Sequence, residues 1–131
     1  FRKLVMDAKV EAVMGAYNRV NDAPANGSKL LLVDILRGKW GFEGHVVSDC
    51  GALNDFHMHH KVTATPAETA ALALKMGCDN ACICTYEALD EAIEHLNRSL
   101  ARFPTDRNLK TLLDTALRYR SNQPLNPGQP R

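Results

Sequence analysis

Hydrophobic and polar positions along the chain repeat one order: a short apolar run, a polar loop and an amphipathic helix. Two apolar runs with β-branched residues, 10–17 and 45–49, predict strands. A third short run, 78–84, is a further candidate strand. Strands that alternate with helical crossovers are typical of a parallel sheet in an α/β fold.

Two helices are predicted from their end signals as well as from their periodicity. The first begins after Ser28 as N-cap and continues to Gly38, and its apolar side chains recur at helical spacing: Leu31, Ile35 and Leu36. The second, 65–77, has a signal at each end. These signals are Thr65 as N-cap, Pro66 at the first helical position, Glu68 for a capping box and Gly77 after the last turn.

Two more amphipathic helices are predicted in the last third of the chain. The helix at 86–103 places its apolar residues on one face: Leu89, Ala92, Ile93, Leu96 and Leu100. The helix at 105–120 is expected to bury its own set in the same way: Leu109, Leu112, Leu113, Ala116 and Leu117. Residues 121–131 are polar and rich in proline, and we expect them to be disordered.

Three strand–helix units are too few to cover both faces of a parallel sheet. The chain of 131 residues is long enough for one modest core, and it begins at Phe1 rather than at Met. We therefore expect it to be a piece of a longer protein, in which the rest of the sheet lies elsewhere.

Composition and charge exclude some classes of partner. Apolar residues make up 45% of the chain, charged residues 24%, and the formal net charge is +1, as in ordinary soluble globular proteins. This balance favours neither a nucleic acid nor an anionic membrane surface as a partner. The longest apolar runs are far too short to span a bilayer.

The cysteines are not spaced like those of a small disulfide-stapled domain. Three of the four lie within seven residues, and the set is Cys50, Cys78, Cys82 and Cys84. We expect them to stay unpaired in a reducing compartment, and the absence of a signal-peptide pattern in residues 1–15 favours a cytoplasmic location.

The most interesting single position is Asp49, where the predicted strand 45–49 stops. In parallel α/β folds, chemistry collects at the carboxyl ends of strands, and Tyr17 follows the other predicted strand in the same way. A carboxylate there can attack an anomeric carbon, with a phenol hydroxyl nearby to orient it. Position alone favours a plainer interpretation, in which Asp49 caps a turn at Gly51.

Two other clusters offer metal-ligating side chains. The stretch "FHMHHK" contains His57, His59 and His60, and His57 with His59 could share a strand face and bind a metal such as zinc. A polar loop that helps to shape a neighbouring site is the favoured interpretation, because no acid or thiol is fixed nearby at ligand spacing. The stretch "CDNACIC" fits neither zinc nor iron–sulfur spacing and favours small buried thiols. We predict no metal site.

The stretch "VMGAYNRVNDAPANGSKLLLVDILRGKWGFEGHVVSDCGAL" resembles the later half of the catalytic barrel of glycoside hydrolase family 3, the β-glucosidases and β-xylosidases. That family carries a "YN-VN" stretch followed by "LL--LR--WGF-G-VVSD". The similarity continues through "TPAETAALALKMGCD" and covers residues 10–93. It implies an α/β fold that forms about strands six to eight of a (β/α)8 barrel.

The resemblance also implies an activity and three site residues. Asp49 corresponds to the nucleophile of a retaining β-glycosidase that acts on terminal β-glucosyl or β-xylosyl residues, Tyr17 to the tyrosine beside it, and Met14 lies near the sugar-binding subsite. No cofactor is implied. Departures from the family are Ile83, where a glycine is usual, and the unmatched residues 104–131. We expect a partial barrel at 1–103, an extra helix at 104–120 and a disordered tail at 121–131.

The second carboxylic acid that a retaining mechanism requires has no matched position in the chain. Glu43, Asp55, Glu68 and Glu87 are the remaining candidates. The alternative to an enzyme segment is therefore a catalytically silent carbohydrate-binding piece that self-associates into a homo-oligomer and buries its open sheet edge against a copy.

Overall fold

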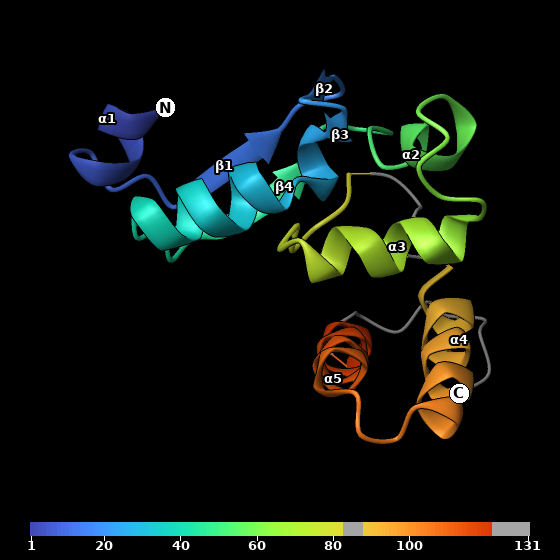
Figure 1. Ribbon diagram of the computed structural model, residues 1–131. Helices are drawn as coiled ribbons and strands as arrows, with labels where there is room; N and C mark the ends of the chain where they lie inside the picture. Colours follow the sequence, from blue (N-terminus) through green and yellow to red (C-terminus); the bar gives the residue numbers. More distant parts are fainter. Residues whose placement is uncertain (83–87, 122–131) are drawn as a thin grey trace.

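The computed structural model describes residues 1–82 and 88–121 (Figure 1). Two parallel strands form its sheet: β1, Ala12–Gly15, and β4, His45–Ser48. Their register runs from Ala12 opposite His45 to Gly15 opposite Ser48. The helix between them, η2 (Lys29–Lys39), makes the crossover that parallel pairing requires. The predicted strands 10–17 and 45–49 and the α/β class are thus confirmed.

The third predicted strand is present as a short parallel contact on the other side of β4. Val47 and Asn80 form an isolated parallel bridge. The backbone N–H of Ser48 donates to the Asn80 carbonyl at 2.9 Å, and the N–H groups of Asp79 and Asn80 both donate to the Val46 carbonyl. Segment 79–82 therefore continues the sheet beyond β4, while the end of the predicted run, including Cys84, lies outside the described residues.

The crossover helix η2 begins at the predicted N-cap, but it is not an ordinary α-helix. The Ser28 hydroxyl accepts a hydrogen bond from the Leu31 N–H at 3.3 Å, which confirms the N-cap. The helix is a π-helix, with the Trp40 N–H donating to the Ile35 carbonyl. Its buried residues are Leu32 and Leu36, whereas the predicted Leu31 and Ile35 are only partly buried.

Helix α3, Pro66–Lys75, confirms the predicted end signals. The Thr65 hydroxyl accepts from the Glu68 N–H at 3.1 Å, and the Glu68 carboxylate accepts from the Ala64 N–H at 2.7 Å. The reciprocal bond of the capping box thus reaches one residue further back than the N-cap itself. Gly77 ends the helix with a φ of +86°, a conformation that favours glycine.

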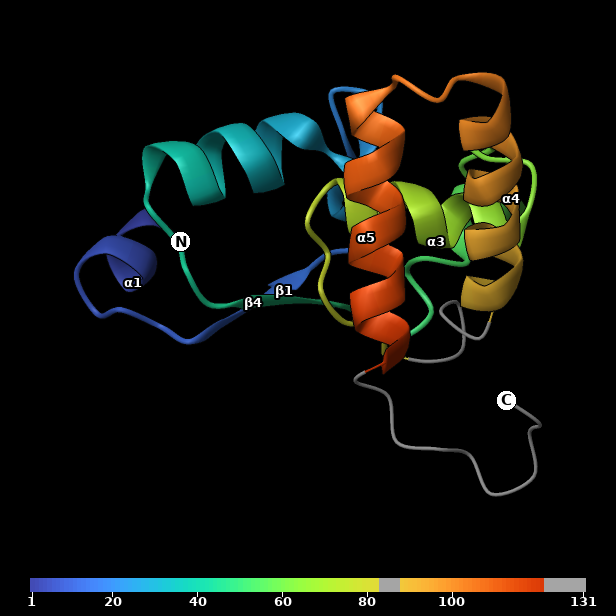
Figure 2. The ribbon, with the colours of Figure 1, turned by 90° about the horizontal axis from the view of Figure 1, so that it is seen from below.

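The last two helices, α4 (Leu89–Arg102) and α5 (Arg107–Ser121), pack against each other and against α3 (Figures 1 and 2). On α4 four predicted residues are buried: Leu89, Ala92, Ile93 and Leu96. On α5 Ala116 is buried, but Leu117 is 41% exposed and its predicted burial is wrong. The side chains of Leu109 and Leu112, whose burial was predicted, are outside the described part of the structure. The tail beyond residue 121, which was predicted to be disordered, is also outside it.

Five short elements, which form four features, were not predicted. They are helix α1 (Arg2–Met6), the antiparallel pair β2 (Arg19–Val20) and β3 (Ala23–Pro24), the 3-10 turn η1 (Ala25–Gly27) and helix α2 (Asp55–Met58). The β2–β3 pair and η1 lie in the polar loop after the predicted strand 10–17, and α2 lies in the polar loop after the predicted strand 45–49. Across the described residues, no helix combines the length and apolar character needed to cross a bilayer.

Within residues 1–82 and 88–121, helices cover one face of the sheet. Helix η2 lies along one side of β1 and β4, and the described helices leave the other side open in Figure 2. Val46 is fully buried and Val13 packs against the core on the covered side. Met14, whose side chain points to the other side by strand alternation, is 60% exposed. The open face is the one that further strands of a barrel would enclose.

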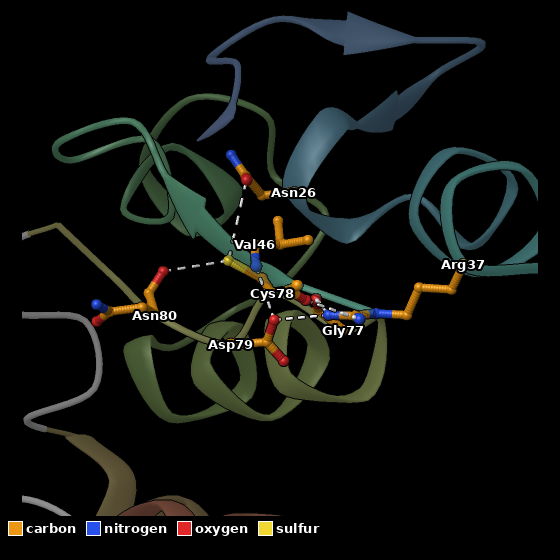
Figure 3. Close-up of polar contacts among 8 residues, drawn as sticks. Asn26, Arg37, Val46, Gly77, Cys78, Asp79 and Asn80 are labelled. Carbon is orange, nitrogen blue, oxygen red and sulfur yellow. Dashed lines mark hydrogen bonds and ion pairs between the residues drawn. The ribbon is translucent and has the colours of Figure 1, made fainter. Parts of the chain in front are cut away.

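A polar clamp fixes the beginning of β4 (Figure 3). The Arg37 guanidinium on η2 donates to the Gly44 and Gly77 carbonyls and binds the Asp79 carboxylate at 2.6 Å. The same carboxylate oxygen accepts from the Val46 N–H at 2.7 Å. Arg37 and Asp79 therefore connect the crossover helix, the first residues of β4 and the segment after α3.

Candidate functional site

Asp49 directly follows β4, at the carboxyl end of the strand. Its N–H donates to the Gly15 carbonyl, and its own carbonyl accepts from the Ala52 N–H at 3.0 Å, which closes a turn. Gly51 has a φ of +83° in this turn, and the Asp49 Oδ1 accepts from the Cys50 N–H at 2.7 Å. The turn-capping interpretation of Asp49 therefore matches the geometry. Among the described residues, its Oδ2 carries no hydrogen bond, so one oxygen of the carboxylate stays available.

Tyr17 follows β1 and comes to the same edge of the sheet. Its hydroxyl oxygen lies 3.3 Å from the point where a Cβ on Gly51 would sit, two residues beyond Asp49. No hydrogen bond joins the hydroxyl to the Asp49 carboxylate among the described residues. Tyr17 is 42% exposed, so its phenol ring borders the turn rather than the core.

Met14 lies on the open face of the sheet, on the same side as Asp49. It pairs in register with Val47, and the side chains of paired residues in a parallel sheet point to the same face. Asp49 is two residues further along β4 and therefore points to that face as well. The structure thus brings all three sequence-predicted site residues to one corner of the sheet: Asp49, Tyr17 and Met14.

The histidine-rich stretch forms part of the loop over this corner. His60 lies with its Nε2 3.0 Å from the Tyr17 carbonyl, so it connects the loop after β4 to the loop after β1. His57 Nδ1 lies 3.1 Å from the Thr69 hydroxyl, and His59 pairs with Asp55 at 3.5 Å. Each histidine has a different partner. In residues 1–82 and 88–121, no three His, Cys, Asp or Glu side chains are grouped in a way that could hold a metal ion.

The cysteines differ from the prediction. Cys50 and Cys82 are joined in a disulfide across a sequence separation of 32 residues, so the expectation that all four cysteines stay unpaired is wrong. The pairing arises because segment 79–82 lies beside β4, which the spacing of the cysteines does not indicate. Cys78 takes no part in a disulfide and is fully buried, as predicted for a small side chain beside the sheet. The argument for a reducing compartment rested on unpaired cysteines and loses that basis.

Two of the four candidates for the second carboxylic acid have other partners in the structure. The Glu68 carboxylate caps α3, and Asp55 pairs with His59. Glu43 is exposed before β4, whereas Glu87 lies outside the described residues. Trp40 follows η2 on the amino-end side of β4 and packs against the core.

Two residues that support the corner were missed from the sequence. Asn26 is fully buried, and its amide Nδ2 donates to the Ala16 carbonyl at 3.1 Å, one residue before Tyr17. The hydroxyl of Ser48, also buried, accepts from the Cys82 N–H at 3.2 Å. The buried positions of these polar residues depend on partners remote in sequence, and no local pattern indicates them.

Comparison with known proteins gives one family. The sequence profile described as "Glycosyl hydrolase family 3 N terminal domain" matches residues 1–109. The chain is 46% identical over 95 residues to a xylan 1,4-β-xylosidase from Xylanibacter ruminicola, covering 71% of this chain and 11% of that protein. It is 38% identical over 120 residues to a probable exo-1,4-β-xylosidase from Neosartorya fischeri, covering 78% of this chain and 16% of that protein.

Solved structures agree. A β-glucosidase from Erythrobacter marinus superposes with a TM-score of 0.66 at 29% identity, over 90% of this chain and 15% of that one. A family 3 exo-β-xylosidase in complex with a xylobiose aziridine probe gives 0.67 at 25% identity, over 88% of this chain and 18% of that one. The chain spans less than a fifth of each of these relatives, and it belongs to glycosyl hydrolase family 3, with residues 1–109 matching part of the N-terminal domain of that family.

Proposed function

We propose that this chain is the part of a retaining β-glycosidase that carries the catalytic nucleophile, Asp49. The observation that supports this most is the place of Asp49: it continues β4 at the carboxyl end and points to the open face of the sheet. Nucleophiles of parallel barrels occupy such positions because side chains there emerge from the sheet onto the loops. The "SD" pair of the family falls on Ser48 and Asp49.

The chemistry follows from a carboxylate at this point. An Asp49 oxygen attacks the anomeric carbon of the sugar while the bond from that carbon to the leaving oxygen breaks, which gives a glycosyl ester. A second carboxylic acid, about 5–5.5 Å from the first, protonates the leaving oxygen and then activates the water that hydrolyses the ester. That acid comes from outside the matched residues. Asp49 therefore supplies one of the two carboxyl groups.

The neighbouring residues have supporting roles in this proposal. The Tyr17 hydroxyl, beside the turn, orients the carboxylate when substrate is bound, and the exposed Met14 side chain provides an apolar contact for the sugar. The substrate class is a terminal β-xylosyl or β-glucosyl residue, since similar proteins are named β-xylosidases and β-glucosidases. No cofactor takes part.

In the same proposal β1, β4 and the segment at 79–82 are about strands six, seven and eight of a (β/α)8 barrel. Their parallel order and the single open face support this placement. The partial barrel then occupies residues 1–103, with 104–120 as an added helix and 121–131 as a tail. The remaining strands would cover the open face and close the barrel.

The exposed sheet face also favours a second candidate, a silent carbohydrate-binding piece that self-associates. β1 has an unpaired edge among the described strands, and Met14 on its open face is 60% exposed. A copy of the chain that covered this face would bury apolar surface without any catalysis. This candidate predicts an oligomer that binds sugar and does not hydrolyse it.

The test is the stereochemistry of hydrolysis by the protein as its gene encodes it. With a nitrophenyl β-xyloside and a nitrophenyl β-glucoside, proton NMR should show the β-anomer as the first product, because two displacements retain configuration. The α-anomer as first product would contradict the retaining mechanism. Binding of both sugars without any turnover would instead favour the silent piece.

Replacement of Tyr17 by Phe should lower kcat by about tenfold, the loss of one hydrogen bond to a charged group, with KM changed less than threefold. The ring is retained, so the fold should be kept. The measurement is steady-state kinetics on the nitrophenyl substrate, with Tyr119→Phe as the matched control in helix α5. An unchanged kcat for Tyr17→Phe would remove Tyr17 from the proposed site.

A further inference from the structure

The residue after Asp49 is both its hydrogen-bond donor and half of the disulfide. The Cys50 N–H donates to Asp49 Oδ1 at 2.7 Å, and the Cys50 sulfur is bonded to that of Cys82. A bond to the charged carboxylate is stronger than a neutral one and fixes the plane of the carboxylate. The direction of this N–H therefore determines where the other oxygen of Asp49 points.

Cys82 is itself fixed to both sides of Asp49. Its N–H donates to the Ser48 hydroxyl at 3.2 Å, one residue before Asp49. Its carbonyl accepts from the Gly51 N–H at 3.0 Å, two residues after Asp49. With the disulfide to Cys50, three links join Cys82 to the residues that flank Asp49. They form a closed frame around the turn.

The disulfide is placed where a small reagent can reach it. Cys50 is exposed and Cys82 is half-buried. Cys78, which takes no part in a disulfide, is fully buried. If the disulfide were cut, the hydrogen bonds of Cys82 to Ser48 and Gly51 would remain. The turn would keep its fold, but Cys50 would lose its covalent restraint.

We propose that the Cys50–Cys82 disulfide positions the Asp49 carboxylate and makes the glycosidase activity sensitive to reduction. The inference rests on the proposed function of Asp49 and adds a redox control of the same site. Cys50 and Cys82 act through Asp49 and are positioning residues. Because a displacement of about 1 Å at a reacting group can cost about a hundredfold in rate, we expect a roughly tenfold loss on reduction.

The redox step is an ordinary exchange with a dithiol such as dithiothreitol. A thiolate of the reagent attacks one sulfur, the Sγ–Sγ bond breaks, and the second reagent thiol completes the transfer. Two protein thiols form and the reagent becomes a cyclic disulfide, so two electrons and two protons pass to the protein. Removal of the reagent and mild oxidation reverse the change.

The test measures the first chemical step alone. A dinitrophenyl 2-deoxy-2-fluoro-β-xyloside forms the glycosyl ester, and the fluorine then slows its hydrolysis because it disfavours the oxocarbenium-like transition state. The labelling rate constant at saturating reagent, and the concentration that gives half of it, are measured for the oxidised, reduced and reoxidised protein. Far-UV circular dichroism checks that the fold is kept.

We expect the rate constant to fall about tenfold on reduction, the half-saturating concentration to stay within twofold, and reoxidation to restore the rate. The double variant Cys50→Ser/Cys82→Ser should label at the slow rate with or without dithiothreitol, which assigns the effect to this disulfide. Equal rates for oxidised and reduced protein, or a change confined to half-saturation, would overturn the inference and leave the proposed function intact. No label in any state, either from this reagent or from the matching 2-deoxy-2-fluoro-β-glucoside, would overturn the proposed function itself.

Discussion

Replacement of Asp49 by Asn is expected to lower kcat/KM for a nitrophenyl β-xyloside by about 10⁴-fold or more, on the scale seen when a covalent nucleophile is removed. The amide cannot form the glycosyl ester. Its oxygen can still accept the hydrogen bond from the Cys50 N–H, so the turn should keep its geometry. The expected loss is therefore one of chemistry and not of folding. Steady-state kinetics and a thermal melt check both parts.

Asp34→Asn is the matched control. Asp34 lies on the exposed surface of η2, where its partner is Lys29, and it undergoes the same change of charge and shape. Its kcat/KM should stay within twofold of the wild type. If Asp49→Asn keeps more than a tenth of the wild-type activity, Asp49 is not the nucleophile.

Replacement of Gly15 by Ala is expected to lower the free energy of unfolding by about 1–3 kcal/mol, the usual cost of overpacking a tight interior. A Cβ on Gly15 would lie within bonding distance of the Asn26 side-chain amide, which is fully buried and donates to the Ala16 carbonyl. The Asn26 amide cannot move away without loss of that hydrogen bond, and the Gly15 backbone cannot move away without loss of the β1–β4 pairing. Urea denaturation monitored by the fluorescence of Trp40 measures the change.

A double-mutant cycle gives the control. Asn26→Ala alone removes a buried hydrogen bond and should cost about 1–3 kcal/mol. In that background Gly15→Ala should cost less than half of its value in the wild type, because the amide that it meets is gone. If the two losses simply add, the close fit of Gly15 against Asn26 does not explain why the position holds glycine.

Local signals predicted the elements whose ends are set by nearby residues. The caps of η2 and α3 are formed by Ser28 and Thr65 within three residues of each helix start, so they can be recognised in the sequence. The two strands were predicted because their apolar runs are short and bounded by polar loops. The π-winding of η2 and the exposure of Leu117 depend on tertiary packing, and periodicity alone does not reveal them.

In the candidate site, too, some features could be predicted from the sequence and others depend on tertiary contacts. The family resemblance singled out Asp49, Tyr17 and Met14, and strand register places them at one corner of the sheet. The links that brace this corner join residues far apart in the chain. The Cys50–Cys82 disulfide and the contact of His60 with the Tyr17 carbonyl each span more than thirty residues. Such pairs become visible only when the parallel order of the strands is known.

The most direct test of the central claim is to locate the trapped sugar on the protein. After labelling with the fluorinated xyloside, reduction and digestion with trypsin, the peptide 40–61 should carry the added mass of one fluoroxylosyl group. Fragment ions should place that mass on Asp49 and leave Glu43 and Asp55 of the same peptide unmodified. A label on any other carboxylate, in this peptide or elsewhere, would contradict the assignment of Asp49 as the nucleophile.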